Sequence, residues 1–305
     1  MPEADCILCI RKKILPIYLR ILANRKHIML EIQIPHTFDL RLTLTSGQFF
    51  QWRADENGYL LQHRNYFFYI EQQEKTLKIS NIVAEMTTDD IIRFFRLEDN
   101  LESIFNRWET PILQKAFGRF CGLTLIRQDP WECLLSFLCS PASNIPRITQ
   151  NLQTIAKRFG TVTDTPMGDS YQLPNPAQLA NASLDELYDT GVGFRARYLY
   201  HVSRILLKNS VLNSLGEMNY TDARSKLMQL PGVGGKVADC VLLFSLDFTE
   251  AFPVDTWISK ILRQEIFPGS TLPPAKLAAR ARQYFGPWAG YAQQYLFHYA
   301  RTEMR

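Results

Sequence analysis

The first third of the chain alternates between apolar and polar positions. Residues 28–34 (IMLEIQI) and 38–44 (FDLRLTL) repeat with a period of two, which predicts half-buried β-strands. Short runs at 59–61, 66–70 and 76–79 continue this pattern, and polar turns separate them. Strands that come first and helices that follow are typical of an α+β fold, so we expect an antiparallel sheet in this part of the chain.

Further along the chain, the apolar positions follow a helical spacing. Asp129-Pro130 is typical of a helix start, since aspartate caps the first turn and proline fits its first position. A second helix is expected from about Asn144 to Phe159, where a glycine ends it. Ser183 begins a capping box, which predicts another helix start. We therefore expect an all-helical second half.

These patterns divide the chain into three parts. Residues 28–115 form a sheet subdomain and residues 116–305 a helical body. Residues 1–27 are an extension of uncertain role. The positive charges at 11–13 follow the first apolar residues instead of preceding an apolar core, which argues against a signal peptide. No apolar run reaches the length of a membrane span, so no membrane partner is expected.

Composition narrows the class of protein only slightly. Hydrophobic residues make up 46% and aromatic residues 12% of the chain, which predicts a folded globular protein. The net charge of +4 permits a nucleic-acid-binding face without demanding one. Cys6 and Cys9 form a C-x-x-C pair with no second pair downstream. We therefore expect free thiols, no metal site and a reducing compartment.

The stretch 230–257 (LPGVGGKVADCVLLFSLDFTEAFPVDTW) carries the most specific pattern. Its beginning is rich in glycine and proline, which predicts a tight turn. A helix-compatible run follows from Lys236, and Asp255 occupies the position of an N-cap. The pattern thus predicts a cation at the start of one helix and a carboxylate at the start of the next.

This stretch resembles the helix-hairpin-helix DNA glycosylases, with LPGVGGKVADC as the hairpin and PVD as the catalytic aspartate motif. Its lysine is similar to that of the bifunctional glycosylase/AP lyases. The resemblance implies that Lys236 attacks C1′ of the sugar and forms a Schiff base, and that Asp255 helps to deprotonate the amine and stabilises the cationic sugar. It also implies that the amides of Gly232 and Gly234 hold a DNA phosphate. Cys240 would sandwich the flipped base together with the lysine.

Two further segments resemble the 8-oxoguanine branch of this superfamily. SGQFFQW at 46–52 resembles a motif whose glycine, here Gly47, presents its carbonyl to the damaged base. Oxidised guanine carries a hydrogen on N7 where guanine has a lone pair, so one backbone acceptor discriminates between them. GPWAGYAQQYLF at 286–297 resembles a segment whose glutamine bonds the base edge and whose phenylalanine stacks on the base, here Gln293 and Phe297. From pattern alone, the segment at 46–52 would be a turn whose aromatic side chains pack inward, and the segment at 286–297 would be a buried core helix.

Two other segments resemble the parts of the family that contact DNA. QDPWECLLSFLCSPASNIPRI implies that Asn144 and Arg147 approach the space left by the extruded base. GVGFRARY implies that Phe194 and Arg195 insert between base steps and contact the orphaned base. Without the resemblance, this second segment is equally a helix entry with solvated arginines.

The chain departs from the family pattern at three places, one of which is Phe244, which replaces a methionine near the pocket. Ala142 and Ser143 replace two asparagines, which leaves the preference for cytosine opposite the lesion open. Trp257 and Ala300 replace a histidine and an aspartate that would pair with each other. This joint replacement implies an aromatic contact by Trp257 near the 5′ phosphate.

The resemblance covers about residues 30–301 and implies a TATA-binding-protein-like antiparallel sheet followed by an all-α helix-hairpin-helix body. The implied function is base-excision repair: flipping 8-oxoguanine out of double-stranded DNA, cleaving its N-glycosidic bond and nicking the abasic site by β-elimination. A glycosylase for a different damaged purine and a non-catalytic DNA-binding protein are the alternatives. We expect a monomer without an iron–sulfur cluster or other metal, with a cation at the hairpin left open, in a bacterial cytoplasm and nucleoid or a eukaryotic nucleus.

Overall fold

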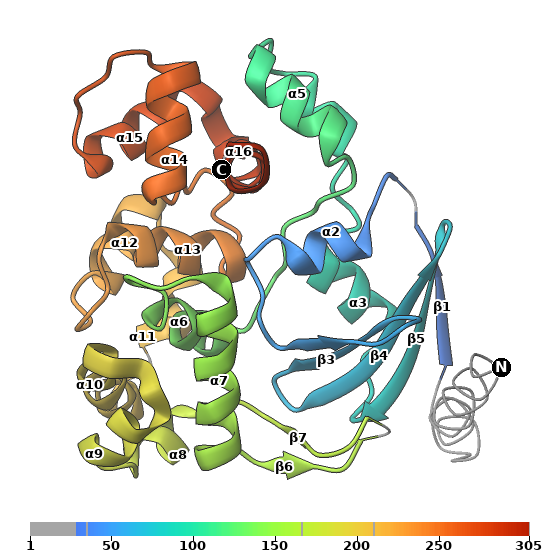
Figure 1. The fold of residues 1–305 in the computed structure, drawn as a ribbon, viewed down its shortest axis with the longest axis vertical. Coiled ribbons are helices and arrows are strands. Elements are labelled where there is room, and N and C mark those ends of the chain that lie inside the picture. The colour runs from blue at the N-terminus through green and yellow to red at the C-terminus, as the bar shows by residue number, and fades with distance from the viewer. Residues whose placement is uncertain (1–28, 35, 166, 210, 305) are drawn as a thin grey trace, which may run out of the picture.

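The computed structural model of the protein describes residues 29–34, 36–165, 167–209 and 211–304, so the predicted extension at 1–27 lies outside the described residues. Its first part is an antiparallel sheet with the strand order β1-β5-β4-β3-β2 (Figure 1). Helices follow, which confirms the predicted α+β fold. The five strands are β1 (Met29–Gln33), β2 (Trp52–Ala54), β3 (Tyr59–His63), β4 (Tyr66–Gln73) and β5 (Thr76–Val83).

The predicted strand at 38–44 is wrong, because this segment forms helix α2 (Leu40–Thr45). Asp39 caps the helix by accepting a backbone N–H at 2.7 Å. Leu40 and Leu44 lie four residues apart and both enter the core beneath the sheet. The same apolar residues therefore fit a helical face as well as an alternating strand, and the aspartate decides between them.

Helices make up most of the remaining described chain. The predicted starts of α6, α7 and α9 are confirmed, with Asp129, Asn144 and Ser183 as the N-caps. The helices are α3 (Thr88–Phe95), α4 (Leu101–Phe105), α5 (Pro111–Arg119), α6 (Pro130–Leu138), α7 (Ile145–Phe159), α8 (Pro176–Ala180), α9 (Leu184–Leu187), α10 (Ala196–Lys208), α11 (Val211–Ser214), α12 (Tyr220–Leu227), α13 (Gly235–Ser245), α14 (Thr256–Ile261), α15 (Pro274–Phe285) and α16 (Ala289–Glu303). A small hairpin, β6 (Val162–Thr163) and β7 (Ser170–Tyr171), follows α7.

Two apolar cores support these layers. One lies between the sheet and helices α2 and α3, and the other fills the helical body. Helices α4 and α5 pack into the helical core, where Phe105 stacks on Phe117 at 4.3 Å and contacts Tyr295 of α16 at 4.5 Å. The division between a sheet subdomain ending at 115 and a helical body stays a prediction.

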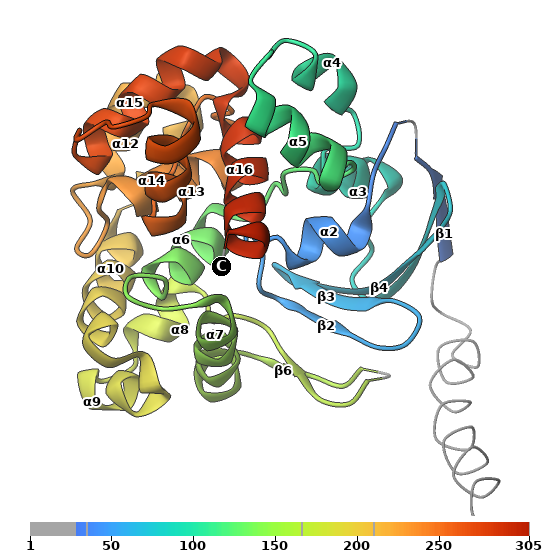
Figure 2. The ribbon, with the colours of Figure 1, turned by 45° about the horizontal axis from the view of Figure 1, so that its top comes forward.

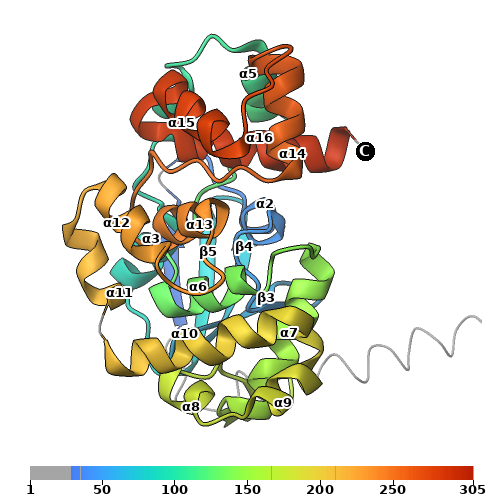
Figure 3. The same ribbon diagram turned by 90° about the vertical axis from the view of Figure 1, so that its left-hand side faces the viewer.

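The fold brings four distant segments together. Helix α13 packs against α6 in the middle of the helical body, and α14 packs against α16 (Figure 3). Helix α16 also lies beside α2 (Figure 2), where Gln294 and Arg301 donate to the carbonyls of Ser46 and Thr45 at 3.4 and 2.9 Å. The sheet subdomain and the helical body thus meet next to the loop that follows α2. In the part of the chain that the structure describes, none of the helices has the length and apolar character needed to cross a bilayer.

Candidate active site and DNA-contacting face

The glycine-rich hairpin joins α12 to α13. Gly232 has a φ of +81°, a left-handed conformation that glycine adopts without a steric cost. A Cβ at this residue would lie 2.3 Å from the Tyr198 ring, so glycine is also required by the packing against α10. Gly234 is the N-cap of α13 and has no side chain in front of the first turn. The hairpin therefore leaves backbone N–H groups of this turn accessible to an anion.

Lys236 lies in the first turn of α13 and reaches across to the end of α6. Its Nζ donates to Ser140 Oγ at 2.9 Å and lies 4.9 Å from the centre of the Phe137 ring. The Ser140 hydroxyl donates its own hydrogen to the Phe137 carbonyl at 2.7 Å, so it faces the amine as an acceptor. Phe137 stacks on Phe244 at 5.6 Å. The amine is thus held by a ring from α6 and by a hydroxyl that lies two residues beyond the end of that helix.

Sequence reasoning missed the contacts that Phe137 and Ser140 make with the lysine. The available signal was weak, because nothing in a local pattern links Ser140 to Lys236. Only the packing of α6 on α13 brings them within reach of each other.

Asp255 caps α14 by accepting the N–H of Ile258 at 2.8 Å. Burial raises the pKa of this carboxyl, and the Ile258 N–H and the charge of Lys236 oppose the shift. The aspartate therefore lies within the electrostatic reach of the lysine. A partly buried carboxylate beside an amine is suited to accept a proton from it and to stabilise a cation.

The predicted base-recognition residues come from three segments, and the structure brings two of them into contact. Gly47 has a φ of +87°, and a Cβ there would lie 3.4 Å from Cε1 of Phe297. The same Cβ would lie 2.5 Å from the terminal methyl of Ile145, so Gly47 also adjoins the start of α7. Gln293 is 5% exposed, and its Oε1 has no hydrogen-bond partner among the described residues. A buried acceptor without a partner is an expected feature of a site that binds a hydrogen-bonding ligand.

Cys240 follows Lys236 by one helical turn and is buried. Desolvation raises the pKa of its thiol to about 12, although the charge of Lys236 opposes the shift. The thiol is therefore neutral at physiological pH and is suited to contact a flat base rather than to act as a nucleophile.

Asn144 and Arg147 lie at the exposed N-terminus of α7. Asn144 caps the helix by accepting the Arg147 N–H at 3.0 Å, and the Arg147 side chain is exposed. Ala142, two residues earlier, has a φ of +49°, a conformation that asparagine tolerates better than alanine. The turn preceding α7 therefore contains an exposed residue in a strained backbone conformation.

Arg195 is placed differently from the surface cation that the sequence suggests. It is 4% exposed, and its guanidinium donates to the carbonyls of Pro141, Val192 and Ala142 at 2.8, 2.9 and 3.0 Å. Desolvation lowers the pKa of this group. Phe194, in contrast, is 50% exposed. Arg195 thus shapes the turn before α7 from behind, and its contact with an orphaned base stays a prediction.

Trp257 lies in the first turn of α14, two residues beyond the capping aspartate. Its side chain is half-buried, and Nζ of Lys260 lies 5.9 Å from its ring. Ala300 is fully buried on α16, which packs against α14. The arrangement leaves an aromatic and a cation near the start of α14, and a phosphate contact there stays a prediction.

A metal could in principle be held by clusters of acidic, histidine or cysteine side chains. Within the described ranges, no group of three or more such residues has a geometry suited to a metal ion. Four cysteines in these ranges, Cys121, Cys133, Cys139 and Cys240, are free thiols. Whether a cation binds at the hairpin therefore depends on its backbone carbonyls, and this stays a prediction.

The two-part fold, the glycine hairpin and the lysine beside a capping aspartate define a helix-hairpin-helix DNA glycosylase. Residues 31–134 match a family model described as the N-terminal domain of 8-oxoguanine DNA glycosylase. The chain is 30% identical to a probable N-glycosylase/DNA lyase of Methanothermobacter thermautotrophicus, over 87% of this chain and 94% of the relative. It is 31% identical to an N-glycosylase/DNA lyase of Arabidopsis thaliana, over 87% of this chain and 78% of the relative.

Solved structures agree with these relatives. The 8-oxoguanine glycosylase/lyase of Clostridium acetobutylicum, bound to duplex DNA with cytosine opposite 8-oxoguanine, matches with a TM-score of 0.84 and 27% identity. The match covers 91% of this chain and 99% of that one. The protein belongs to the family of 8-oxoguanine N-glycosylase/DNA lyases.

Proposed function

We propose that this protein excises 8-oxoguanine from double-stranded DNA and then nicks the abasic site. The observation that carries the proposal is the Lys236 amine, which is held by Ser140 and Phe137 and whose charge acts on the partly buried Asp255. Gly47 and Phe297, the two proposed walls of the base site, lie in contact with each other. Nucleophile, carboxylate and base pocket come from segments far apart in sequence. A protein that only bound DNA would need none of the three.

The reaction uses the lysine twice. The neutral Lys236 amine attacks C1′, the glycosidic C1′–N9 bond breaks, and its electron pair leaves with the base, which takes up a proton. Asp255 accepts a proton from the attacking amine and stabilises the positive charge on the sugar. The lone pair of the Lys236 nitrogen then expels O4′ from C1′, and O4′ takes up a proton, so the sugar ring opens and a protonated Schiff base remains. This Schiff base acidifies the C2′ hydrogen. Loss of that proton breaks the C3′–O bond, and the 3′ phosphate leaves by β-elimination.

The proposed base pocket selects oxidised guanine by hydrogen bonding. The Gly47 carbonyl accepts the N7 hydrogen that 8-oxoguanine has and guanine lacks, and the side chain of Gln293 bonds the base edge. Phe297 stacks on one face of the base, and Cys240 with Lys236 covers the other. An unoxidised guanine would place its N7 lone pair against the carbonyl, and such a mismatch of buried polar groups discriminates strongly.

We further propose that the enzyme works as a monomer and needs no metal or iron–sulfur cluster, because an amine and a carboxylate suffice for this chemistry. The partner is damaged duplex DNA. Asn144, Arg147 and Phe194 would contact it beside the extruded base, while Gly232, Gly234 and Trp257 would contact its backbone. A DNA-containing compartment, here a bacterial cytoplasm and nucleoid, is the proposed location.

Borohydride trapping of the Schiff base tests the proposal. We expect the protein to form a covalent complex with a duplex containing 8-oxoguanine, and Lys236→Gln to abolish the complex while duplex binding persists. Lys276→Gln, an exposed lysine on α15, is the matched control and should trap like wild type. Trapping that survives Lys236→Gln would overturn the assignment of the nucleophile.

A second arm tests the substrate. Excision is measured on duplexes with 8-oxoguanine opposite each of the four bases and on duplexes with an alkylated purine. Faster release of the alkylated purine would favour the alternative glycosylase. Binding to every duplex without cleavage would favour a non-catalytic DNA-binding protein.

A further inference from the structure

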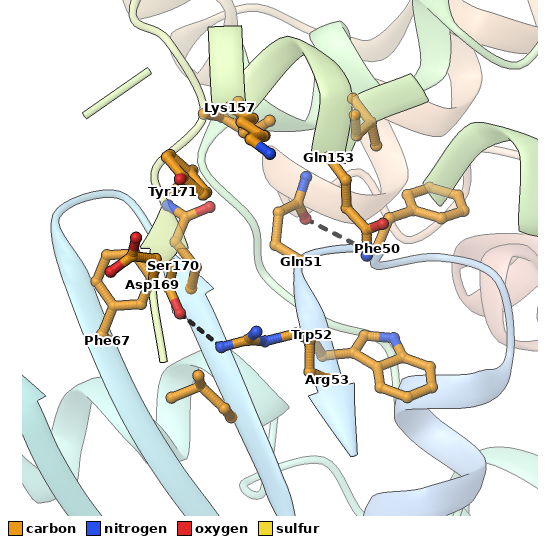
Figure 4. A pocket seen from close by; sticks show the side chains of 15 residues that line it. Phe50, Gln51, Trp52, Arg53, Phe67, Gln153, Lys157, Asp169, Ser170 and Tyr171 are labelled. Atoms are coloured by element: carbon orange, nitrogen blue, oxygen red, sulfur yellow. Dashed lines mark hydrogen bonds between the residues drawn. The ribbon is translucent and has the colours of Figure 1, made fainter. Parts of the chain in front are cut away.

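A pocket that contains none of the proposed catalytic or base-recognition residues lies between the sheet subdomain and the helical body (Figure 4). Its volume is about 290 Å³, at the small end of the range found for sites that bind small molecules. Strands β2 to β4, helix α7 and the hairpin strand β7 all contribute to its walls. The apolar part of its lining is rich in rings and comprises Phe50, Trp52, Leu60, Phe67, Leu152 and Tyr171.

The charge in this pocket comes chiefly from Arg53 and Lys157. Arg53 extends from β2, is half-buried, and donates to Ser170 Oγ at 2.7 Å (Figure 4). Burial alone lowers the pKa of Arg53, and no acidic side chain among the described residues opposes that shift. A partly buried guanidinium without an anionic partner is unfavourable, and an anion bound beside it would remove that cost.

Lys157 supplies the second cation from the opposite wall. It extends from α7 toward the space above Arg53 (Figure 4). Asp169 is the acidic lining residue, and its side chain is exposed. The balance of charge inside the pocket therefore favours an anionic group placed between the strand and the helix.

An unpaired acceptor lies in the same wall. Gln62 is 6% exposed and lines the pocket. Its Nε2 donates to the Arg64 carbonyl at 2.7 Å and to Glu132 Oε1 at 3.0 Å, which fixes the orientation of the amide. Its Oε1 has no hydrogen-bond partner among the described residues. A buried amide oxygen without a partner is unfavourable, and an N–H donor of a ligand would supply the missing partner.

We propose that this pocket is a binding site for a small planar heteroaromatic anion that carries a ring N–H. The rings of the wall contact its faces, Arg53 and Lys157 bind its anionic group, and Gln62 accepts its N–H. The volume limits the ligand to one or two fused rings with a single carboxylate or a similar acid group.

The pocket shares no lining residue with the proposed DNA-contacting face. Lys157 lies twelve residues along α7 from Ile145, which corresponds to about 18 Å at 1.5 Å per residue. The α7 residues that line the pocket begin at Leu152, which lies five residues beyond Arg147 and thus about 7.5 Å farther along the helix. Duplex DNA and the small anion should bind at the same time.

Calorimetric titration with indole-3-carboxylate tests the proposal on the full-length protein. This probe has two fused rings, one N–H and one carboxylate. We expect saturable binding with one site per chain, weakened about 10- to 100-fold by Arg53→Gln, as for loss of a charge-assisted hydrogen bond. Lys157→Gln changes an exposed position of α7 and should also lower the affinity for this probe. Lys276→Gln is the matched control and should bind like wild type.

Changes to the probe test the two polar contacts without altering the protein. Indole-3-carboxamide lacks the charge, and 1-methylindole-3-carboxylate lacks the N–H donor, so both should bind at least about 10-fold more weakly. The Lys236→Gln variant, which should bind DNA without cleaving it, is used for the competition test. Its affinity for indole-3-carboxylate should be the same with and without a saturating 8-oxoguanine duplex. Absence of saturable binding, equal affinity for the carboxamide, or displacement by the duplex would each overturn the proposal. None of these outcomes bears on the proposed glycosylase activity.

Discussion

Replacing Gly47 by alanine should separate the role of the base pocket from the stability of the fold. Gly47 has a φ of +87°, and an alanine in this left-handed region costs about 1–2 kcal/mol. The new Cβ would also lie 2.5 Å from the Ile145 terminal methyl. Moving that methyl adds an overpacking cost of about 1–3 kcal/mol, so the free energy of unfolding should fall by about 2–5 kcal/mol.

The effect on catalysis should be larger than the effect on stability suggests. The added methyl would lie 3.4 Å from Cε1 of Phe297, which narrows the proposed slot for the base and displaces the Gly47 carbonyl. A misplacement of about 1 Å typically costs about 100-fold in rate, so single-turnover excision of 8-oxoguanine should fall by about that factor or more. Binding to undamaged duplex should not change, because Gly47 is not among the predicted backbone contacts.

Two other glycines provide matched controls for this experiment. Gly168 has a φ of +83° with open space at its Cβ position, so Gly168→Ala measures the backbone cost alone. Gly118 has open space and lies within α5, where alanine should stabilise by about 0.4–1 kcal/mol. If Gly47→Ala excises 8-oxoguanine at the wild-type rate while Gly168→Ala shows the expected loss of stability, the assignment of Gly47 to the base pocket is refuted.

Four further changes test other parts of the structure. Ser140→Ala should slow borohydride trapping about 10-fold without changing duplex affinity, because Lys236 loses its acceptor at 2.9 Å; equal trapping rates would contradict this. Asp255→Asn keeps an N-cap for α14 but should slow excision about 100- to 10,000-fold, and an unchanged Tm would show that the loss is chemical. Ala142→Gly should raise the free energy of unfolding by about 0.5–1 kcal/mol, measured by urea denaturation, because φ is +49° there. Burial lowers the pKa of His298 from 6.5 to about 4, so between these values the unfolded state binds more protons. Stability should therefore decrease by about 2 kcal/mol from pH 7 to pH 5, and His298→Gln should remove this part of the dependence.

The hairpin and the positions of Lys236 and Asp255 at the starts of two helices could be predicted because each is carried by a short local motif, whereas the roles of these residues stay predictions. A glycine turn, a lysine after it and a capping aspartate are readable within 230–257. The prediction of a strand at 38–44 was wrong for a local reason: Asp39 caps a helix there, although the apolar residues alternate as in a strand. Helix and strand periods coincide over so short a segment, and only the cap distinguishes them.

Hydrogen bonds between buried polar groups that are far apart in the sequence could not be predicted from it. Arg195 follows a turn and is flanked by exposed Phe194, so it resembles a solvated cation. It is buried because carbonyls at Pro141 and Val192 need donors, and one of these is far away in sequence. The same holds for the pocket around Arg53, whose walls come from a sheet and a helix that no local pattern relates.

The replacement of the family's asparagines before α7 can be understood from these contacts. Asparagine favours the left-handed backbone that Ala142 adopts at a φ of +49°, so an alanine there leaves the turn without local support. Arg195 supplies the support from behind by donating to the carbonyls of Pro141 and Ala142. A turn held through its carbonyls keeps its shape whatever side chains it presents, but alanine has no polar group with which to meet an orphaned base. Polar contact with that base from this part of the chain must then come from Asn144 and the exposed Arg147. Fewer polar side chains are thus available to recognise the base opposite the lesion than in relatives that keep both asparagines. We therefore expect a weaker preference for cytosine at that position.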